Sequence, residues 1–190
     1  VKILATSRAR LNIQGEQLFY LSGMDFPNWE APQDASEYSA VKLFMQTAHR
    51  VRPNFELTAD NMRYIVRLCR LVEGSPLGIL LAGSWMEMLA PDEIAGEIEK
   101  SLDFLETRQR DVPERQHSMR AVFDTSWKLL TSGEQNVFMK SSVFRGGFAR
   151  EAAQQVTGAS LRDLMGLVDK SLLQRNPSGR YGIHELLRQY

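Results

Sequence analysis

The chain has 190 residues, and its 23 basic and 23 acidic side chains give a formal net charge of zero. That balance argues against a protein that coats nucleic acid, because such proteins are usually strongly basic. The composition, 43% hydrophobic and 24% charged, excludes a disordered chain and fits one or two globular domains. The single cysteine, Cys69, excludes an internal disulfide and a zinc site of several thiolates, and we expect it to be an inert core residue.

Both ends of the sequence suggest a piece of a longer protein, since it opens on Val1 within an apolar run and stops within a helical pattern. No signal peptide precedes the first run. The longest apolar stretch, residues 77–90, has about 14 residues, whereas a membrane-spanning helix needs about 20. We therefore expect a cytoplasmic protein without membrane contact.

Two short apolar runs near the start are typical of buried β-strands. Residues 1–5 precede the polar residues 6–8, and residues 18–21 form the second run. Both predict members of a parallel sheet whose other strands are not in this sequence. Residues 24–34, which contain two prolines, predict a linker.

The middle of the chain predicts a domain of amphipathic helices. Apolar residues repeat at helical spacing in two stretches, and Thr58 is placed to cap the second helix. Gly74 suits the left-handed end of that helix, and Ser75 with Pro76 predicts the start of a third. This third helix is apolar on nearly every face, so we expect it to be buried. A fourth helix is predicted to begin at Pro91, which two acidic residues follow.

The last part of the chain predicts helices followed by a β-hairpin. Ser132 with Gln135, and Ser160 with Asp163, have the spacing of capping boxes at two helix starts. Apolar pairs then flank residues 176–179, whose composition is typical of a turn. Helices followed by such a hairpin predict a winged helix.

These patterns predict a mainly α-helical chain in three parts. Residues 1–33 are expected to be the remnant of an α/β sheet with a linker. Residues 34–112 are expected to form a helical bundle, and residues 113–190 a winged-helix domain. The last boundary falls in a charged stretch that contains a proline and lacks an apolar period.

Three short elements, in this order and at these distances, resemble the STAND class of NTPases, an NB-ARC-like group of nucleotide switches. Residues 4–8, Leu-Ala-Thr-Ser-Arg, resemble its sensor-1 strand end, and residues 74–77, Gly-Ser-Pro-Leu, resemble its Gly-x-Pro motif. Residues 183–188, Ile-His-Glu-Leu-Leu-Arg, resemble its Met-His-Asp motif in the form common among bacterial members. Residues 39–90 and 119–188 also resemble bacterial transcriptional regulators of this class.

Through this resemblance, four residues become candidates for phosphate contacts. Arg8 is the implied sensor of the terminal phosphates of ATP, and Thr6 and Ser7 are implied to orient it or to bind phosphate. His184 is implied to contact the β-phosphate of ADP and to hold a closed state. The residue types alone leave other readings open: a solvated loop arginine, a loop cap, and a histidine packed at a strand–helix junction.

The Gly-x-Pro resemblance concerns the adenine base. Pro76 places a rigid ring at a helix start and is implied to pack on adenine, with Gly74 as the glycine of the motif. Without the resemblance, Pro76 predicts an ordinary helix N-terminus. Ser75 and Gly78 stand where leucine and alanine are commoner, which predicts looser packing, and Glu185 replaces the usual aspartate.

The leading hypothesis is the C-terminal part of a nucleotide switch in a STAND-class signalling or transcription-regulating ATPase. The first 33 residues would then end a P-loop NTPase sheet. The phosphate-binding loop and the acidic metal-binding strand are not in this sequence, so ATP or ADP with Mg²⁺ is expected only in a full-length parent. We expect the chain alone to be inactive and to bind no nucleotide tightly, and the parent to be a slow ATPase. No catalytic or metal-ligating residue is assigned.

The expected partners are the upstream nucleotide-binding half of the same protein and, on activation, further copies of the parent. One alternative is a winged-helix DNA-binding module. Its third helix carries Arg162 and Lys170 against Asp163 and Asp169, a balanced face without strong attraction for DNA, so we expect no DNA contact. The other alternative is a helical protein-interaction module that binds no nucleotide.

Overall fold

The computed structural model describes residues 3–7, 9–11, 13–19, 21–28, 34–107 and 111–190. The chain divides into two compact units. One, here called the bundle unit, comprises residues 21–122 with 189–190, and the other, the hairpin unit, comprises residues 1–20 with 123–188. Within the described part of the chain, no helix combines the length and the apolar character that crossing a membrane requires.

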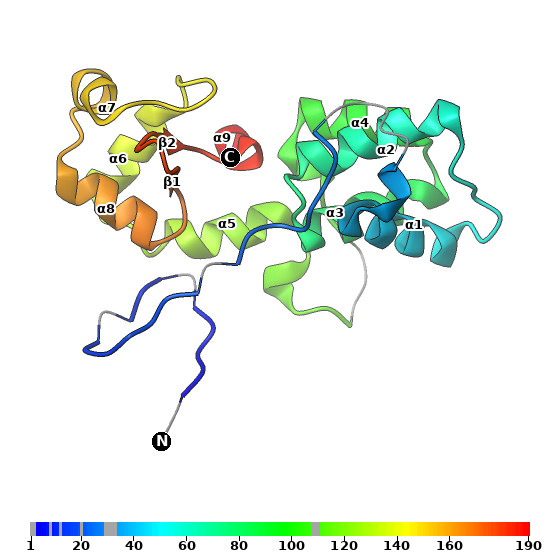
Figure 1. Ribbon diagram of the computed structural model, residues 1–190, viewed down its shortest axis with the longest axis horizontal. Helices are drawn as coiled ribbons and strands as arrows, with labels where there is room; N and C mark the ends of the chain where they lie inside the picture. The colour runs from blue at the N-terminus through cyan, green and yellow to red at the C-terminus, as the bar shows by residue number, and fades with distance from the viewer. Residues whose placement is uncertain (1–2, 8, 12, 20, 29–33, 108–110) are drawn as a thin grey trace. The chain divides into compact units, whose positions relative to one another are not determined.

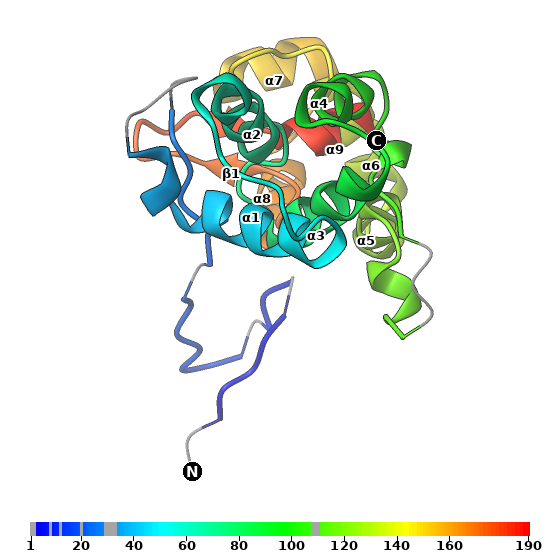
Figure 2. The same ribbon diagram turned by 90° about the vertical axis from the view of Figure 1, so that its right-hand side faces the viewer.

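The bundle unit is built from four α-helices and several short 3-10 turns. Helix α1 packs on α3, and α2 packs on α4, as Figures 1 and 2 show. The helix α5 (Met119–Trp127) contains the boundary between the two units. The other elements are η1 (Ala35–Glu37), α1 (Ser39–Val51), α2 (Ala59–Leu71), α3 (Pro76–Ser84), η2 (Trp85–Glu87), α4 (Pro91–Lys100), η3 (Leu102–Phe104) and η4 (Glu114–Gln116).

Side-chain caps fix where these helices begin. The Thr58 hydroxyl accepts from the Asn61 amide, and the Asn61 side chain accepts from the Thr58 amide at 2.9 Å, which closes a capping box on α2. At α4 the carboxylate of Glu93 accepts from the Ala90 amide at 2.8 Å, ahead of Pro91 in the first helical turn. The predicted starts of α2, α3 and α4 are confirmed.

The largest fully buried side chains of the bundle unit are all apolar. Helix α3 is largely buried, as predicted, and a Cβ atom at Gly83 would lie only 2.8 Å from the Thr47 side chain of α1, so a glycine lets the two helices approach. Cys69 is buried, and burial raises the pKa of its thiol to about 12, which confirms an inert core cysteine. The largest fully buried side chains of this unit are Phe44, Ile65, Leu68, Ile79, Met86, Ile94, Ile98, Leu102 and Leu105.

The hairpin unit contains short helices and one two-stranded antiparallel sheet. Helix α6 packs against both α7 and α8. The sheet pairs Gln174 with Gly182 and Arg175 with Tyr181, and Phe148 makes a further bridge to Tyr181, so the predicted hairpin is confirmed. The elements are α6 (Ser132–Ser141), α7 (Arg150–Thr157), α8 (Leu161–Asp169), β1 (Gln174–Arg175), β2 (Tyr181–Gly182) and α9 (Glu185–Gln189).

One predicted helix start is displaced by a residue. The cap of α6 is Thr131, not Ser132, because the Glu134 carboxylate accepts from the Thr131 amide at 2.7 Å. A carboxylate is a stronger acceptor than the Gln135 amide that the Ser132 box requires. Gln135 instead donates to the backbone oxygen of Trp127 at 3.4 Å. The box of Ser160 with Asp163 forms at α8 as predicted.

The two predicted strands near the start are wrong for the described residues. Residues 3–7, 18, 19 and 21 form no strand, and Ile3 and Leu4 are 88% and 97% exposed. An extended segment becomes a strand only by pairing, and no described segment pairs with either run. The described residues therefore form a mainly helical protein whose sheet is the β1–β2 hairpin, and the P-loop sheet remnant is not formed. The winged-helix assignment stays a prediction.

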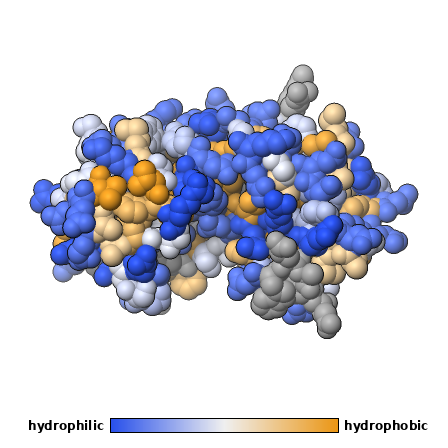
Figure 3. All heavy atoms as spheres, turned by 90° about the horizontal axis from the view of Figure 1, so that it is seen from above, coloured by the Kyte–Doolittle hydropathy of each residue, from blue (hydrophilic) through white to orange (hydrophobic). Residues whose placement is uncertain are grey.

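The surface mixes polar and apolar side chains. In the view of Figure 3, hydrophilic residues predominate and apolar side chains gather in separate patches. In the hairpin unit the exposed apolar side chains include Met139, Val143, Val156, Leu161 and Met165. Scattered exposure of this kind is ordinary for a folded domain.

Candidate functional site

The turn at Gly74 accepts no side chain larger than hydrogen. Gly74 has a φ of +66°, and its amide donates to the Cys69 carbonyl at 2.9 Å, which closes the end of α2. Its carbonyl accepts from the Met24 amide at 2.8 Å, and a Cβ atom would lie 2.1 Å from the Met24 oxygen. The left-handed backbone and the crowded neighbour therefore both require glycine at this position.

The start of α3 presents a proline ring to solvent. Ser75 caps the helix by accepting from the Gly78 amide at 3.3 Å, and Pro76 occupies the first helical turn with an exposed ring. The packing is close and not loose as expected, because a Cβ atom at Gly78 would lie 2.8 Å from the Val72 side chain. A rigid apolar ring thus lies at the positive end of a buried helix.

His184 lies between β2 and α9 and is half-buried. Its Nδ1 accepts from the Leu186 amide at 3.2 Å, so the ring caps the first turn of α9. An accepting Nδ1 carries no proton, and the neutral ring therefore has its proton on Nε2. His184 combines a helix-capping acceptor with an N–H donor on the opposite side of the ring.

Glu185, the residue after His184, is an ionised carboxylate held by Arg188. The Arg188 guanidinium hydrogen-bonds both carboxylate oxygens of Glu185, with Nε 2.9 Å from Oε2. This contact holds the pKa of Glu185 below its ordinary value against the opposing effect of burial, and it raises the pKa of Arg188. The positive charge of Arg145 lowers the pKa of Glu185 further. The longer side chain at this position is therefore engaged within α9.

The predicted sensor segment is exposed where it is described. Thr6 and Ser7 are both exposed, and the Ser7 hydroxyl contacts the backbone of Ala9, at 2.6 Å to its oxygen and 3.2 Å from its amide. Arg8 lies outside the described residues. Thr6, Ser7 and His184 belong to the hairpin unit, whereas Gly74 and Pro76 are neighbours in the bundle unit.

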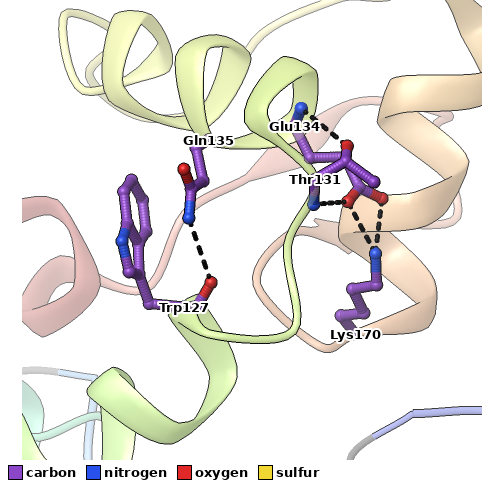
Figure 4. Close-up of polar contacts among 5 residues, drawn as sticks. All are labelled: Trp127, Thr131, Glu134, Gln135 and Lys170. Atoms are coloured by element: carbon purple, nitrogen blue, oxygen red, sulfur yellow. Dashed lines mark hydrogen bonds and ion pairs between the residues drawn. The ribbon is translucent and has the colours of Figure 1, made fainter.

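A polar cluster that sequence reasoning missed lies between α6 and α8. Glu134 is only 7% exposed, and Lys170 donates to both of its carboxylate oxygens at 2.6 Å (Figure 4). Thr131 donates its amide to the same carboxylate, and a Cβ atom at Gly166 would lie 2.0 Å from Oε1. The Glu134 carboxylate is thus engaged by Lys170 and Thr131 and lies against Gly166, which favours a structural role.

The charge of Glu134 depends on its partners. Burial alone raises the pKa of this carboxyl, but the hydrogen bonds from Lys170 and Thr131 outweigh burial and hold the pKa below its usual value. The carboxylate therefore stays ionised, with a compensating ammonium beside it. The one sequence signal was the capping-box spacing of Thr131 and Glu134, since Lys170 lies 36 residues away along the chain.

No metal centre can be assigned from side-chain clusters. Among the described residues, His, Cys, Asp and Glu side chains form no group of three or more that could hold an ion. His49 and His117 instead contact the backbone oxygens of Phe55 and Val112.

Comparison with known proteins gives relatives but no family. No protein-family model matches the chain, and no solved structure matches it. It is 33% identical over 198 aligned residues to proteins of Mycobacterium tuberculosis and Mycobacterium bovis, each named "Putative HTH-type transcriptional regulator". It is 30% identical over 200 residues to an uncharacterized protein of Mycobacterium tuberculosis. The alignments cover 99% of this chain, which spans 21% of the length of the first two relatives and 48% of the third.

Proposed function

We propose that this chain is the C-terminal part of an ATP/ADP-dependent switch in a transcriptional regulator of the STAND class. The names of the mycobacterial relatives support the regulator half of this proposal. The nucleotide half depends on one observation, the turn from Gly74 to Pro76. There an exposed proline ring lies at the N-terminus of a largely buried helix, two residues after Gly74, whose position admits only glycine.

Two residues, one in each unit, have side chains whose chemistry suits parts of a nucleotide. The Pro76 ring offers a rigid apolar face against which a purine can pack. His184, whose Nε2 carries the proton, offers a hydrogen-bond donor suited to a phosphate oxygen. When bound, the nucleotide supplies a planar base and an anionic chain, and Mg²⁺ would be held by the upstream half of the parent.

Switching follows from unequal binding to two states. In the proposed switch, the closed state binds ADP more tightly than the open state does. ADP then stabilises the closed state in proportion to that difference, and exchange for ATP releases it. The capping bond from the Leu186 amide keeps the His184 ring in one orientation, so the donor is positioned before the ligand arrives.

Variants of His184 in the full-length parent test the phosphate contact. His184→Asp keeps a side-chain acceptor for the α9 cap but replaces the donor with a negative charge. We expect ADP affinity, measured by fluorescent-ADP titration, to fall at least tenfold, since charge-assisted hydrogen bonds contribute about 1.5 to 3 kcal/mol. An unchanged affinity in a variant with unchanged thermal unfolding would contradict the proposal.

Pro76→Ala tests the adenine contact in the same protein. Alanine suits the first helical turn, so the helix remains while the ring is lost. We expect ADP to bind about three- to tenfold more weakly, since the removed ring buries apolar area on the base. Pro113→Ala, at an exposed proline before η4, is the matched control and should leave ADP affinity unaltered.

A second candidate, DNA binding, is favoured by the order of elements in the hairpin unit. Helix α6, the Phe148 bridge, α7, α8 and the β1–β2 hairpin follow one another as in a winged helix. The outer face of α8, however, exposes Leu161 and Met165 with Arg162 as its exposed base. Such a face lacks the cationic groups that dominate DNA affinity.

A mobility-shift assay on random duplex at low salt separates the two candidates. We expect the 190-residue chain to cause no shift of the duplex. A shift that weakens with salt and is lost in Arg162→Ala would transfer the assignment to DNA binding.

A further inference from the structure

The bundle unit contains a cavity of about 470 Å³ that the proposed switch does not use. This volume is within the range of about 300 to 1,000 Å³ that is typical of small-molecule sites. None of its lining residues belongs to the Gly74–Pro76 turn. The lining residues are Val51 at the end of α1, Ser84 at the end of α3, Trp85, Glu87 and Met88 beyond it, and Glu106 with Thr107.

Trp85 forms a rigid wall of this cavity. Its indole stacks on Phe104 with the ring centroids 4.6 Å apart and an interplanar angle of 22°. The indole Nε1 donates to the Phe104 carbonyl at 3.0 Å, so both the stacked face and the polar edge are held by the protein. A side chain held in this way loses little conformational freedom when a ligand binds.

The remaining apolar lining is exposed to solvent. Met88 is 74% exposed and Val51 is 37% exposed, although both are apolar. Methionine adapts its shape to irregular partners, and covering both side chains would remove apolar surface from water. The lining therefore favours an occupant with an apolar body.

The charge of the lining has one sign. Glu87 and Glu106 are exposed, and neither has a cationic partner among the described residues. Elsewhere in the same unit, Glu99 pairs with Arg67 and Asp103 with Arg120. Two carboxylates beside an aromatic wall favour a ligand that carries positive charge.

We propose that this cavity binds a small organic cation with an aromatic or branched apolar body, of the arylalkylammonium class. The apolar body lies against Trp85, Val51 and Met88, and the ammonium faces Glu87 and Glu106. This site does not depend on the proposed nucleotide switch, because the two share no residue. It gives the bundle unit a ligand of its own.

Titration of the 190-residue chain with benzyltrimethylammonium tests the proposal. The indole N–H signal of Trp85, identified in the ¹H–¹⁵N spectrum by its loss in Trp85→Phe, should shift in a saturable way. Benzyl alcohol, which is neutral, and phenylacetate, which is an anion, should bind about three- to tenfold more weakly or not at all. Equal binding of all three probes, or no shift of Trp85, would overturn the proposal.

Two isosteric variants locate the charge. Glu87→Gln and Glu106→Gln should each weaken binding of the cation about two- to fivefold while leaving binding of benzyl alcohol unchanged. Glu56→Gln, at an exposed glutamate of the same unit that does not line the cavity, is the matched control. The acidic rim has no role if both cavity variants bind the cation as tightly as the control does.

Discussion

The two units of the molecule are stabilised in different ways. In the bundle unit the fully buried side chains are apolar, from Phe44 in α1 to Leu105 after η3. In the hairpin unit the contact between α6 and α8 includes the partly buried ion pair of Glu134 and Lys170. Apolar burial is insensitive to pH, whereas a buried pair is stable only while both partners are charged. The hairpin unit is therefore expected to respond to pH more steeply than the bundle unit.

The largest expected effect comes from a cavity in the bundle unit. Phe44→Ala removes a fully buried ring and should lower the free energy of unfolding of that unit by about 3 to 5 kcal/mol. Urea titration monitored by hydrogen exchange measures the free energy of unfolding of each unit separately. The control Phe19→Ala, at a ring of the hairpin unit that is 87% exposed, should change the free energy of either unit by less than about 0.5 kcal/mol. Similar losses in both variants would contradict the apolar core described for the bundle unit.

The next effect is specific to the hairpin unit. Lys170→Met leaves the Glu134 carboxylate buried without its cation and should cost about 2 to 4 kcal/mol in that unit. The double variant with Glu134→Gln should recover part of this loss, because the uncompensated charge is gone. Lys140→Met, at an exposed lysine of α6, serves as the control. If it lowered the free energy of unfolding as much as Lys170→Met does, the loss could not be attributed to the ion pair.

A smaller effect is expected from pH. A carboxyl whose pKa is lowered by folding stabilises the folded state above its unfolded pKa, which for glutamate is about 4.3, and that contribution is lost as the pH falls through the lower folded pKa. Among the described residues, such groups are Glu134, Asp163 and Glu185 in the hairpin unit and the exposed Asp25 in the bundle unit.

Urea titrations between pH 7 and pH 3 should therefore show the hairpin unit losing stability below about pH 4.5 more steeply than the bundle unit. Glu134→Gln should flatten that slope. Parallel losses in the two units would show that the buried pair does not set the difference.

The smallest effect concerns a surface pair of the bundle unit. Arg67 makes a two-pronged contact with Glu99, but the two side chains are 41% and 40% exposed. Arg67→Gln should cost no more than about 1 kcal/mol, and 1 M salt should reduce the difference from the wild-type protein. Arg63→Gln, whose partner is the Tyr64 hydroxyl, is the comparison variant. A loss of more than about 1 kcal/mol in the free energy of unfolding would mean that ion pairs stabilise the bundle unit as much as the hairpin unit.

Local chemistry made much of the fold predictable. Thr58, Ser75 and Ser160 cap the helices that their spacing predicted, and residues 176–179 form the turn of the hairpin. These signals act within a few residues, so the sequence alone carries them. The strands predicted for the runs at residues 1–5 and 18–21 are wrong for the described residues 3–5, 18, 19 and 21, because a strand depends on a partner that the local pattern does not contain.

The candidate site was predictable only in part. The glycine at position 74 and the proline at 76 occupy the helix junction that their chemistry required. The capping role of His184, and with it the proton on Nε2, depends on the backbone path of α9 and could not be derived from residue types. Glu134 and Lys170 are 36 residues apart in the sequence, so no short-range pattern could predict their contact.

Gly166 gives a practical marker for interpreting related sequences. Its missing side chain is the space that the Glu134 carboxylate occupies, and that carboxylate is held in place by Thr131 and Lys170. An alanine at 166 would displace the carboxylate, so the three positions 134, 166 and 170 should vary together. A homologue with a larger residue at 166 is then expected to have replaced the ion pair with neutral side chains, and its hairpin unit should tolerate acid.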